Sequence, residues 1–218
     1  MTKNEANRRT KPANADAQAR PASAMRNHIL NTAFQLIATH GYEATSLRML
    51  AHEVGLKAPS LYNYIGSKQQ LLVELLEHAI QDLTNRSLGQ LSVANEGPQS
   101  RLRTFVSVHL MVHMERRDQV FVGNSELRSL AAANRERIIK LRKDYENILI
   151  DILRDGKEKG DFRIDDLQMT AFGILSMLSG VASWYKPGGR LSRNTIVSVY
   201  ADNVFRLLGC HNPNGEKR

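Results

Sequence analysis

The chain has 218 residues, a formal net charge of +8 and 42% hydrophobic residues, which is enough for one large domain or two modest ones with a buried core. Its single cysteine excludes an intramolecular disulfide and a thiolate metal cluster, as is typical of the reducing cytoplasm, and no signal sequence opens the chain. The positive charge favours a polyanionic partner and is densest towards the N-terminus.

The first part of the chain predicts an arm followed by three helices. Residues 1–25 are polar and aperiodic, and we expect a disordered basic arm. From 26–40, apolar residues recur at helical spacing and predict the first helix. Thr45 or Ser46 is expected to cap a second helix that ends near Val54, and a third, very short helix is predicted over 58–65.

The rest of the chain also shows helical patterns. Ser67 and Gln70 form a capping box, which predicts a long helix through about Leu83. Gly156 and Gly160 are expected to mark the end of a later helix, and Asp165 to cap the one after it. Further helices are predicted over 99–115, 119–132, 135–159, 166–185 and 192–208. No alternating strand pattern is present, so the predicted fold class is all-α.

The stretch 167–185 has no charged residue, and such a length could cross a membrane. Polar residues interrupt it, and nothing else in the chain resembles a span, so we expect no membrane partner. The small residues Gly173, Ser176, Gly180 and Ser183 fall on one stripe, which permits close helix packing. With the helix 192–208, this stripe predicts a two-fold four-helix interface and hence a homodimer. Packing within one chain is the alternative.

The segment 45–64 carries the most specific signal in the sequence. It reads as two short helices broken at Gly55, and the second one carries hydroxyls, an amide and a lysine. Two helices joined by a tight, glycine-containing turn form the unit that places its second helix in the DNA major groove. The segment therefore predicts sequence-specific binding to double-stranded DNA.

Over residues 26–72 the chain resembles the TetR family of bacterial transcriptional repressors. The matching residues are Ile29, Ala33–Leu36, Gly41–Ser46, Ala51, Glu53–Leu56, Ser60–Ile65, Ser67, Lys68, Leu71 and Leu72. The resemblance implies a helix-turn-helix DNA-binding domain over 26–72 and a ligand-binding and dimerisation domain over 73–218. It also implies a repressor that an effector releases from an inverted-repeat operator in the cytoplasm.

The resemblance assigns DNA contacts to individual residues. It implies that Lys57, Ser60, Tyr62 and Tyr64 face DNA and that Lys68 reaches a phosphate. From the sequence itself, Thr45 and Ser46 stand at a helix N-terminus, where free N–H groups favour a phosphate, and either one can instead simply cap the helix. Asn63 either reads a base or is solvated. Both tyrosines have a packing alternative, which for Tyr64 includes packing combined with a backbone contact.

The C-terminal half resembles acyl-CoA-responsive regulators of fatty-acid and sterol catabolism more loosely, over 160–163 and 184–192. A ligand cavity is expected between the helices from 99 to 185. Candidate wall residues are Phe105, His109, Met111, Met114, Phe121, Met177 and Trp184, with Arg128 for an anionic group. Ordinary core packing, and for Arg128 a surface ion pair, are the alternatives. The effector hypothesis is an acyl-CoA thioester, with a neutral hydrophobic or aromatic compound as the competitor.

Two other classes of protein were weighed. His109 and His113 are four residues apart, which is metal-ligand spacing, but two ligands do not complete a zinc site. Leu110 stands where a catalytic zinc helix has glutamate. No nucleophile arrangement or phosphate loop is visible, so we predict no catalytic residue, no metal and no cofactor. An architectural DNA binder without a ligand cavity is a third reading.

Overall fold

The computed structural model describes residues 14–94 and 97–210, with side chains from Ser23 onward. Within these ranges the chain is helical and contains no strand, which confirms the all-α prediction. The elements are α1 (Asn14–His40), α2 (Leu47–Glu53), α3 (Ala58–Leu61), α4 (Lys68–Leu91), α5 (Pro98–Glu115), α6 (Arg117–Ser125), the 3₁₀ helix η1 (Glu126–Ser129), α7 (Ala132–Glu158), α8 (Leu167–Ser179), α9 (Val181–Trp184) and α10 (Arg193–Leu207).

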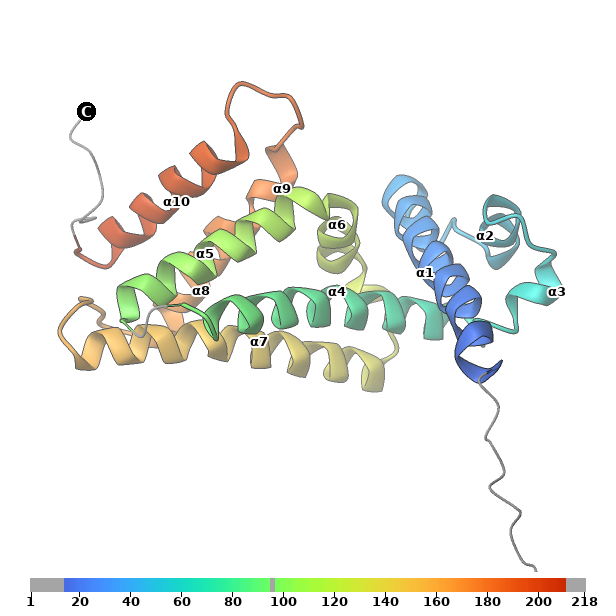
Figure 1. Ribbon diagram of the computed structural model, residues 1–218, viewed down its shortest axis with the longest axis horizontal. Coiled ribbons are helices and arrows are strands. Elements are labelled where there is room, and N and C mark those ends of the chain that lie inside the picture. The colour runs from blue at the N-terminus through green and yellow to red at the C-terminus, as the bar shows by residue number, and fades with distance from the viewer. Residues whose placement is uncertain (1–13, 95–96, 211–218) are drawn as a thin grey trace, which may run out of the picture.

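The helices form a small head and a larger body (Figure 1). The head consists of α1, α2 and α3 at one end of the molecule, and α5 to α10 make up the body. The long helix α4 starts in the head and runs along the body beside α7. A movement of α4 or α7 therefore reaches the head directly.

The helix α1 begins at Asn14, earlier than predicted. Residues 14–25 are helical, whereas we expected an aperiodic arm over 1–25. Five of these twelve residues are alanine, the residue with the highest helix propensity. Extending a helix that 26–40 already nucleates is cheaper than starting one, so no apolar periodicity is needed. Residues 1–13 lie outside the described residues.

Within the head, the reading unit is short and tightly turned. Ser46 caps α2, its Oγ accepting from the Met49 N–H at 3.1 Å. Gly55 makes the turn to α3 with φ 69°, a value that other residues adopt rarely. The helix α3 ends at Leu61, four residues before the predicted end, and the Tyr64 N–H donates to the Leu61 carbonyl at 2.9 Å. Such a three-residue hydrogen bond tightens the chain into a turn.

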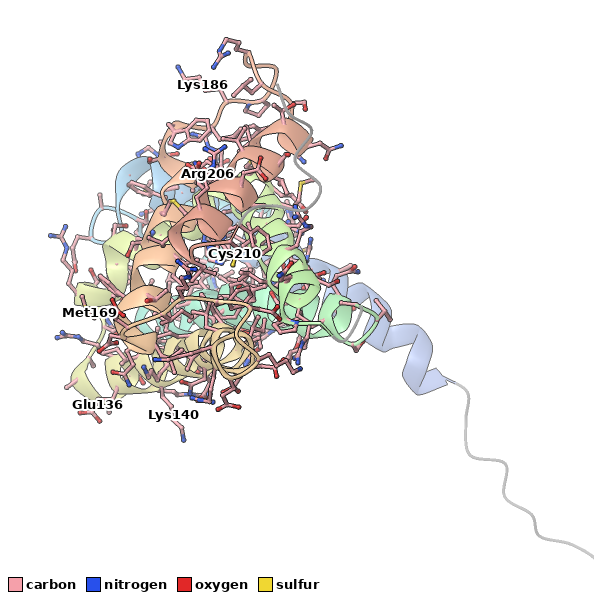
Figure 2. All side chains as sticks on the ribbon, turned by 90° about the vertical axis from the view of Figure 1, so that its left-hand side faces the viewer. Glu136, Lys140, Met169, Lys186, Arg206 and Cys210 are labelled. Atoms are coloured by element: carbon pink, nitrogen blue, oxygen red, sulfur yellow. The ribbon has the colours of Figure 1, made fainter. Side chains whose placement is uncertain are left out.

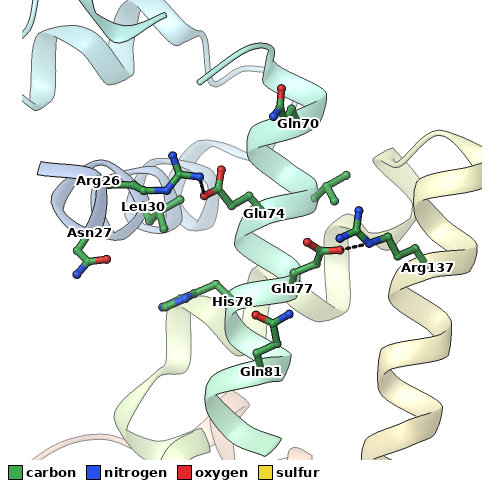
Figure 3. Close-up of a pocket in the computed structure, with 10 residues that line it drawn as sticks. Arg26, Asn27, Leu30, Gln70, Glu74, Glu77, His78, Gln81 and Arg137 are labelled. Atoms are coloured by element: carbon green, nitrogen blue, oxygen red, sulfur yellow. Dashed lines mark hydrogen bonds and ion pairs between the residues drawn. The ribbon is translucent and has the colours of Figure 1, made fainter. Parts of the chain in front are cut away.

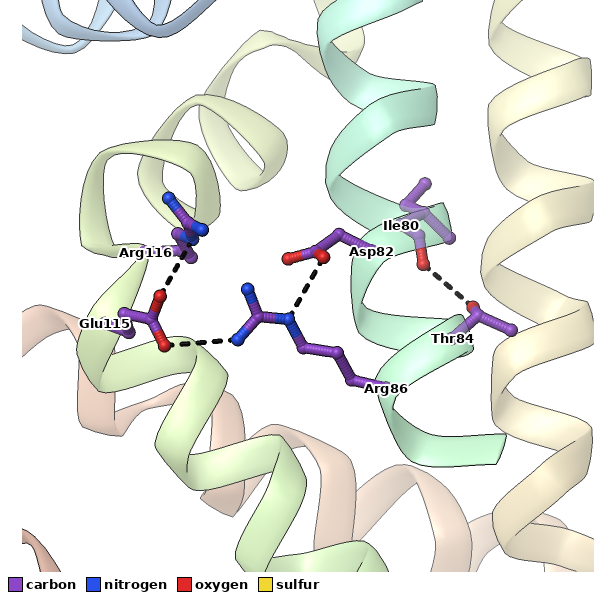
Figure 4. Close-up of polar contacts among 6 residues, drawn as sticks. All are labelled: Ile80, Asp82, Thr84, Arg86, Glu115 and Arg116. Carbon is purple, nitrogen blue, oxygen red and sulfur yellow. Dashed lines mark hydrogen bonds and ion pairs between the residues drawn. The ribbon is translucent and has the colours of Figure 1, made fainter. Parts of the chain in front are cut away.

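In the body, α4 continues to Leu91, beyond the predicted end near Leu83, and is tied to α5. Figure 4 shows Arg86 between Asp82 and Glu115, with nitrogen–oxygen distances of 3.0 and 3.2 Å. Glu115 also pairs with Arg116 at 3.3 Å. The Arg86 side chain is 37% exposed, so these pairs orient the helices more than they stabilise them.

Two later boundaries differ from the predictions. Gly156 lies inside α7, where the Phe162 ring occupies the space that a Cβ atom would need, and Gly160 with φ 77° makes the turn. Asp166, and not Asp165, caps α8, because its Oδ1 accepts from the Met169 N–H at 2.8 Å. The predicted helix 166–185 is divided at Gly180 into α8 and α9. The segment predicted as a helix over 119–132 is α6 followed by η1.

The buried side chains form two clusters. The body cluster is built mainly from α5, α7, α8 and α10 and includes Phe105, Leu149, Ile174 and Phe205. The head cluster contains side chains of all three head helices and of α4, such as Phe34 and Leu72. It also takes in Val122, Leu130 and Ile138 from the body. The head is therefore packed on the body through apolar contacts as well as through α4.

Candidate DNA-reading surface and effector core

The outer side of α3 and the turn after it form an exposed polar surface. Lys57 and Asn63 are exposed, and Tyr62 is 58% exposed, which is high for an aromatic side chain. Ser60 is half-buried beside them. Leu61 is 1% exposed and fixes the opposite side of the helix in the head core. A short helix with one buried face and one polar face can enter a DNA groove without unfolding the head.

Thr45 does not belong to this surface. Its side chain is 4% exposed, and its Oγ1 donates to the Gly41 carbonyl at 2.8 Å. The predicted phosphate contact through Thr45 therefore does not fit, because the hydroxyl is turned into the head. Ser46 is exposed, and at its side lies Arg48, an exposed cation on α2 that the sequence analysis did not include. Only its residue type and its position in the first turn of α2 could have indicated it.

Tyr64 and Lys68 both make contacts within the head. Tyr64 is half-buried and packs against the head cluster, while its carbonyl accepts from Arg26 Nη1 at 3.1 Å. Lys68 Nζ donates to the Glu43 carbonyl at 3.0 Å and lies 4.3 Å from the centre of the Tyr42 ring. The packing alternative for Tyr64 thus has direct contacts behind it, and Lys68 is held at the edge of the reading surface.

The body core contains a string of neutral polar groups from four helices. His109 Nδ1 is 3.0 Å from the Tyr145 hydroxyl, and His109 Nε2 is 3.2 Å from Ser179 Oγ. The Tyr145 hydroxyl is 3.5 Å from Ser87 Oγ. His113 Nδ1 donates to the His109 carbonyl at 2.9 Å, and the two imidazole rings stack with centres 3.9 Å apart. This string crosses α4, α7, α5 and α8 inside an otherwise apolar core.

Burial keeps these groups uncharged. It lowers the pKa of His113 to about 4 and the pKa of His109 well below its ordinary value, with the neighbouring His113 adding to the effect on His109. Burial also raises the pKa of Tyr145 above its ordinary value. The polar atoms inside the core therefore offer hydrogen bonds and no charge at neutral pH.

Acidification is expected to destabilise the protein through this pair. The pKa of His113 is 6.5 in its ordinary state and about 4 when folded, so the unfolded chain holds more protons between these values. The stability is complete above about pH 6.5 and is lost as the pH falls, by about 1.4 kcal/mol per pH unit for each histidine that titrates. Urea unfolding at several pH values would measure this slope.

The matched variants for this prediction are His113→Leu and His52→Ala. His113→Leu should flatten the dependence between pH 6.5 and 4, whereas His52, whose side chain is 88% exposed, should leave it unchanged. Equal slopes in the wild type and His113→Leu would contradict the assignment.

The predicted ligand residues do not gather at one place. Phe105, His109 and Met114 are buried in α5, and Met177 is half-buried against the same core. Phe121 and Trp184 are 55% and 47% exposed on α6 and α9. Arg128 is exposed on η1 beside the head, away from the body core. The structure thus brings four of them together as core and leaves three on the surface.

A groove of about 490 Å³ lies elsewhere, between α1, α4 and α7 (Figure 3). Two ion pairs stand on its walls: Arg26 with Glu74 across α1 and α4, and Arg137 with Glu77 across α7 and α4. The lining is polar and balanced in charge, and the groove marks the junction of head and body.

The face formed by α8 and α10 is apolar and uncovered. Of the eleven exposed large hydrophobic side chains of the described residues, five lie in α8, α9 and α10: Met169, Phe172, Trp184, Val199 and Leu207. Figure 2 turns this end towards the viewer, with Met169 and Arg206 labelled. Trp184 stacks on Tyr200 with ring centres 6.3 Å apart, which joins α9 to α10. Exposed apolar side chains gathered in this way mark an interaction site.

The same region contains the one described helical stretch that is apolar enough to cross a membrane, Leu167–Trp184, of which 22% is buried. One such stretch is weak evidence for a span. The uninterrupted helix α8 has 13 residues, about 20 Å long, against about 30 Å for the hydrocarbon core of a bilayer. The uncovered face of α8 is better explained by a protein partner.

The chain matches known proteins over both parts. Residues 29–75 match the family described as bacterial regulatory proteins, tetR family, and residues 95–208 match the tetracyclin repressor-like C-terminal domain. The HTH-type transcriptional repressor KstR2 of Mycolicibacterium smegmatis is 29% identical over 93% of this chain and 98% of its own length.

Solved structures agree with this assignment. The TetR family regulator PfmR from Thermus thermophilus has a TM-score of 0.74 and 34% identity, covering 82% of this chain and 97% of its own. AibR, crystallised with isovaleryl coenzyme A and operator DNA, has a TM-score of 0.76 and 26% identity over 83% and 98%. The helix-turn-helix head, the all-helical body and these matches together show that the chain belongs to the TetR family of DNA-binding transcriptional regulators.

Proposed function

We propose that this protein is a homodimeric repressor that binds an inverted-repeat operator and is released by a small-molecule effector. The observation that carries the proposal is the exposed set Lys57, Tyr62 and Asn63 on a short helix whose other face is buried. Lysine and asparagine are donors to phosphates and base edges, and an exposed tyrosine offers a hydroxyl and an apolar ring. As a regulator of genes, the protein acts in the cytoplasm.

The remaining predicted contacts have supporting roles in this proposal. Ser60 lies beside the exposed set and meets DNA once α3 enters the major groove. Ser46, Tyr64 and Lys68 surround it and meet the phosphate backbone, which fixes the register of the head without reading sequence. Thr45 contributes only by holding the turn before α2.

The dimer in this proposal forms through α8 and α10. Their uncovered apolar side chains are the support, because a two-fold axis would bury the same face of both protomers at once. The axis would place two α3 helices about 34–36 Å apart, one turn of B-DNA, and so requires two half-sites related by inversion.

The effector proposed here is an acyl-CoA thioester. The body core offers apolar side chains and neutral hydrogen-bonding groups, which suit an acyl chain and an uncharged carbonyl. The phosphates of coenzyme A are too costly to bury there and would stay at the surface near basic side chains. The crystal structure of AibR with isovaleryl coenzyme A supports this class of effector for a protein of similar fold. A neutral hydrophobic or aromatic compound is the competing effector.

The first test is to select DNA. Duplexes carrying a random 30-base-pair insert would be enriched on the full-length protein and sequenced. The proposal expects an inverted repeat whose half-sites lie about 10 base pairs apart centre to centre. Enrichment of single sites or of no sequence at all would contradict it.

The second test separates the two effector classes. Acyl-CoAs from isovaleryl to long-chain, the matching free acids and a panel of uncharged aromatic compounds would be titrated against the repressor–operator complex. We expect thioesters to release the operator, free acids to be inactive, and the affinity for the thioester, measured on the free protein, to weaken with salt, because coenzyme A carries several negative charges. Release by an uncharged aromatic compound and by no thioester would overturn the acyl-CoA proposal and leave the repressor proposal intact.

A further inference from the structure

A segment between α6 and α7 is hydrogen-bonded to the head through one glutamine side chain. Gln69, in the first turn of α4, donates from Nε2 to the Tyr42 hydroxyl at 3.1 Å and to the Ser129 carbonyl at 2.6 Å. Its Oε1 accepts from the Ala131 N–H at 3.3 Å. One amide thus joins three places in the chain: the turn after α1, the end of η1 and the start of α7.

A buried carboxylate completes this joint from the other side. Glu126 is 8% exposed. Its Oε1 accepts from the Tyr42 N–H at 3.4 Å, and its Oε2 accepts from the Ser129 hydroxyl at 2.7 Å. A buried carboxylate without hydrogen-bond donors is very costly, so its partners are held in place strongly. We name Gln69, Glu126, Tyr42, Ser129 and Ala131 the head–body joint.

The joint is placed between the effector core and the head. The segment Glu126–Ala131 is the only connection between α6, which packs on α1, α4 and α9, and α7, which supplies Tyr145 to the core string. The ion pairs in the groove also join head and body, but Arg26 and Arg137 are 48% and 65% exposed. Exposed pairs hold a geometry weakly, whereas buried and half-buried neutral hydrogen bonds are directional.

We propose that Gln69 and Glu126 are positioning residues that set the angle of the DNA-reading head on the body and thereby the separation of the two heads in the dimer. This inference rests on the proposed function, because separation matters only to a dimer on an inverted repeat. Neither residue lies on the reading surface, so neither contributes a DNA contact. Their effect is on the second head: once one head has bound, a fixed angle raises the effective concentration of the other at its half-site.

The test compares three DNA duplexes with four proteins. The duplexes are the selected operator, the same operator with two base pairs inserted between its half-sites, and a duplex with a single half-site. The proteins are the wild type, Gln69→Leu, Glu126→Gln and the control Gln81→Leu, an exposed glutamine further along α4. Gln69→Leu removes all three hydrogen bonds at similar volume, and Glu126→Gln replaces one acceptor oxygen with a donor.

Both joint variants should bind the operator about tenfold more weakly, bind the single half-site within about twofold of the wild type, and discriminate less against the inserted spacing. Gln81→Leu should match the wild type on all three duplexes. A head that is merely misfolded would lose the single half-site equally, so an equal loss on operator and half-site would overturn the proposal. Unchanged operator binding and unchanged spacing preference would overturn it as well.

The failure of the joint and the failure of the proposed function are distinguishable. If the wild type selects an inverted repeat and the variants behave as the wild type does, only the joint is wrong. If the wild type selects no inverted repeat, the dimeric repressor is wrong and the positioning role falls with it.

Discussion

Replacing Lys57 and Tyr62 together with alanine is expected to abolish operator binding at concentrations where the wild type is saturated. Each contact to a base edge or phosphate contributes about 1–3 kcal/mol, so two lost contacts weaken binding by about 30- to 10,000-fold if they add. Both side chains are exposed, and the buried Leu61 that anchors α3 is untouched. The dimer and the free energy of unfolding should therefore stay as in the wild type.

The single variants separate two kinds of contact. Lys57→Ala should weaken all DNA sequences alike and reduce the slope of log affinity against log salt by about one, as expected for one lost phosphate contact. Tyr62→Ala should leave that slope unchanged. Gel shifts over a range of salt concentrations measure both. Full affinity in the double variant, with intact folding by circular dichroism, would show that this surface does not meet DNA.

Replacing Phe172 with glutamate is expected to convert the protein into a monomer that no longer represses. Phe172 is 65% exposed in the single chain, so the change costs the monomer little. In a two-fold interface the carboxylate is buried twice, once from each protomer, and burying an unpaired charge costs several kcal/mol each time. Sedimentation velocity and gel shifts on the same sample would show the loss of the dimer and of operator binding together.

The matched control is Ile139→Glu on α7, where an apolar side chain that is 45% exposed lies outside α8 and α10. It should remain dimeric. A milder variant, Ser176→Leu on the uncovered side of α8, should overpack the interface at a cost of about 1–3 kcal/mol and show only at low protein concentration. A dimeric Phe172→Glu variant would place the interface elsewhere.

The sequence by itself determined the elements whose signals are local. The caps at Ser67 and Ser192 are in place, each accepting a backbone N–H three residues on, and the break at Gly55 makes the turn between α2 and α3. A cap or a turn depends on a few neighbouring residues, so its signal is readable in the sequence. The same is true of the helical periods that give the all-α fold.

Choices between neighbouring candidates were decided by tertiary contacts. Ser46 rather than Thr45 caps α2, because Thr45 is turned into the head core, and Phe162 packs on Gly156, so that this glycine lies within α7 instead of ending it. Neighbours in the chain do not reveal which of two equivalent residues faces the core. The positions of Phe121 and Trp184 at the surface could not be read from their apolar character for the same reason.

The head–body joint has no sequence signal at all. Gln69 lies 60 residues from Ser129, and Tyr42 lies 84 residues from Glu126. A glutamine in the first turn of a helix is ordinary, and its hydrogen bonds to distant backbone groups exist only after the head has packed on α6 and α7. Helices and their caps follow from short-range interactions, whereas the angle between head and body depends on contacts that only the folded chain brings together.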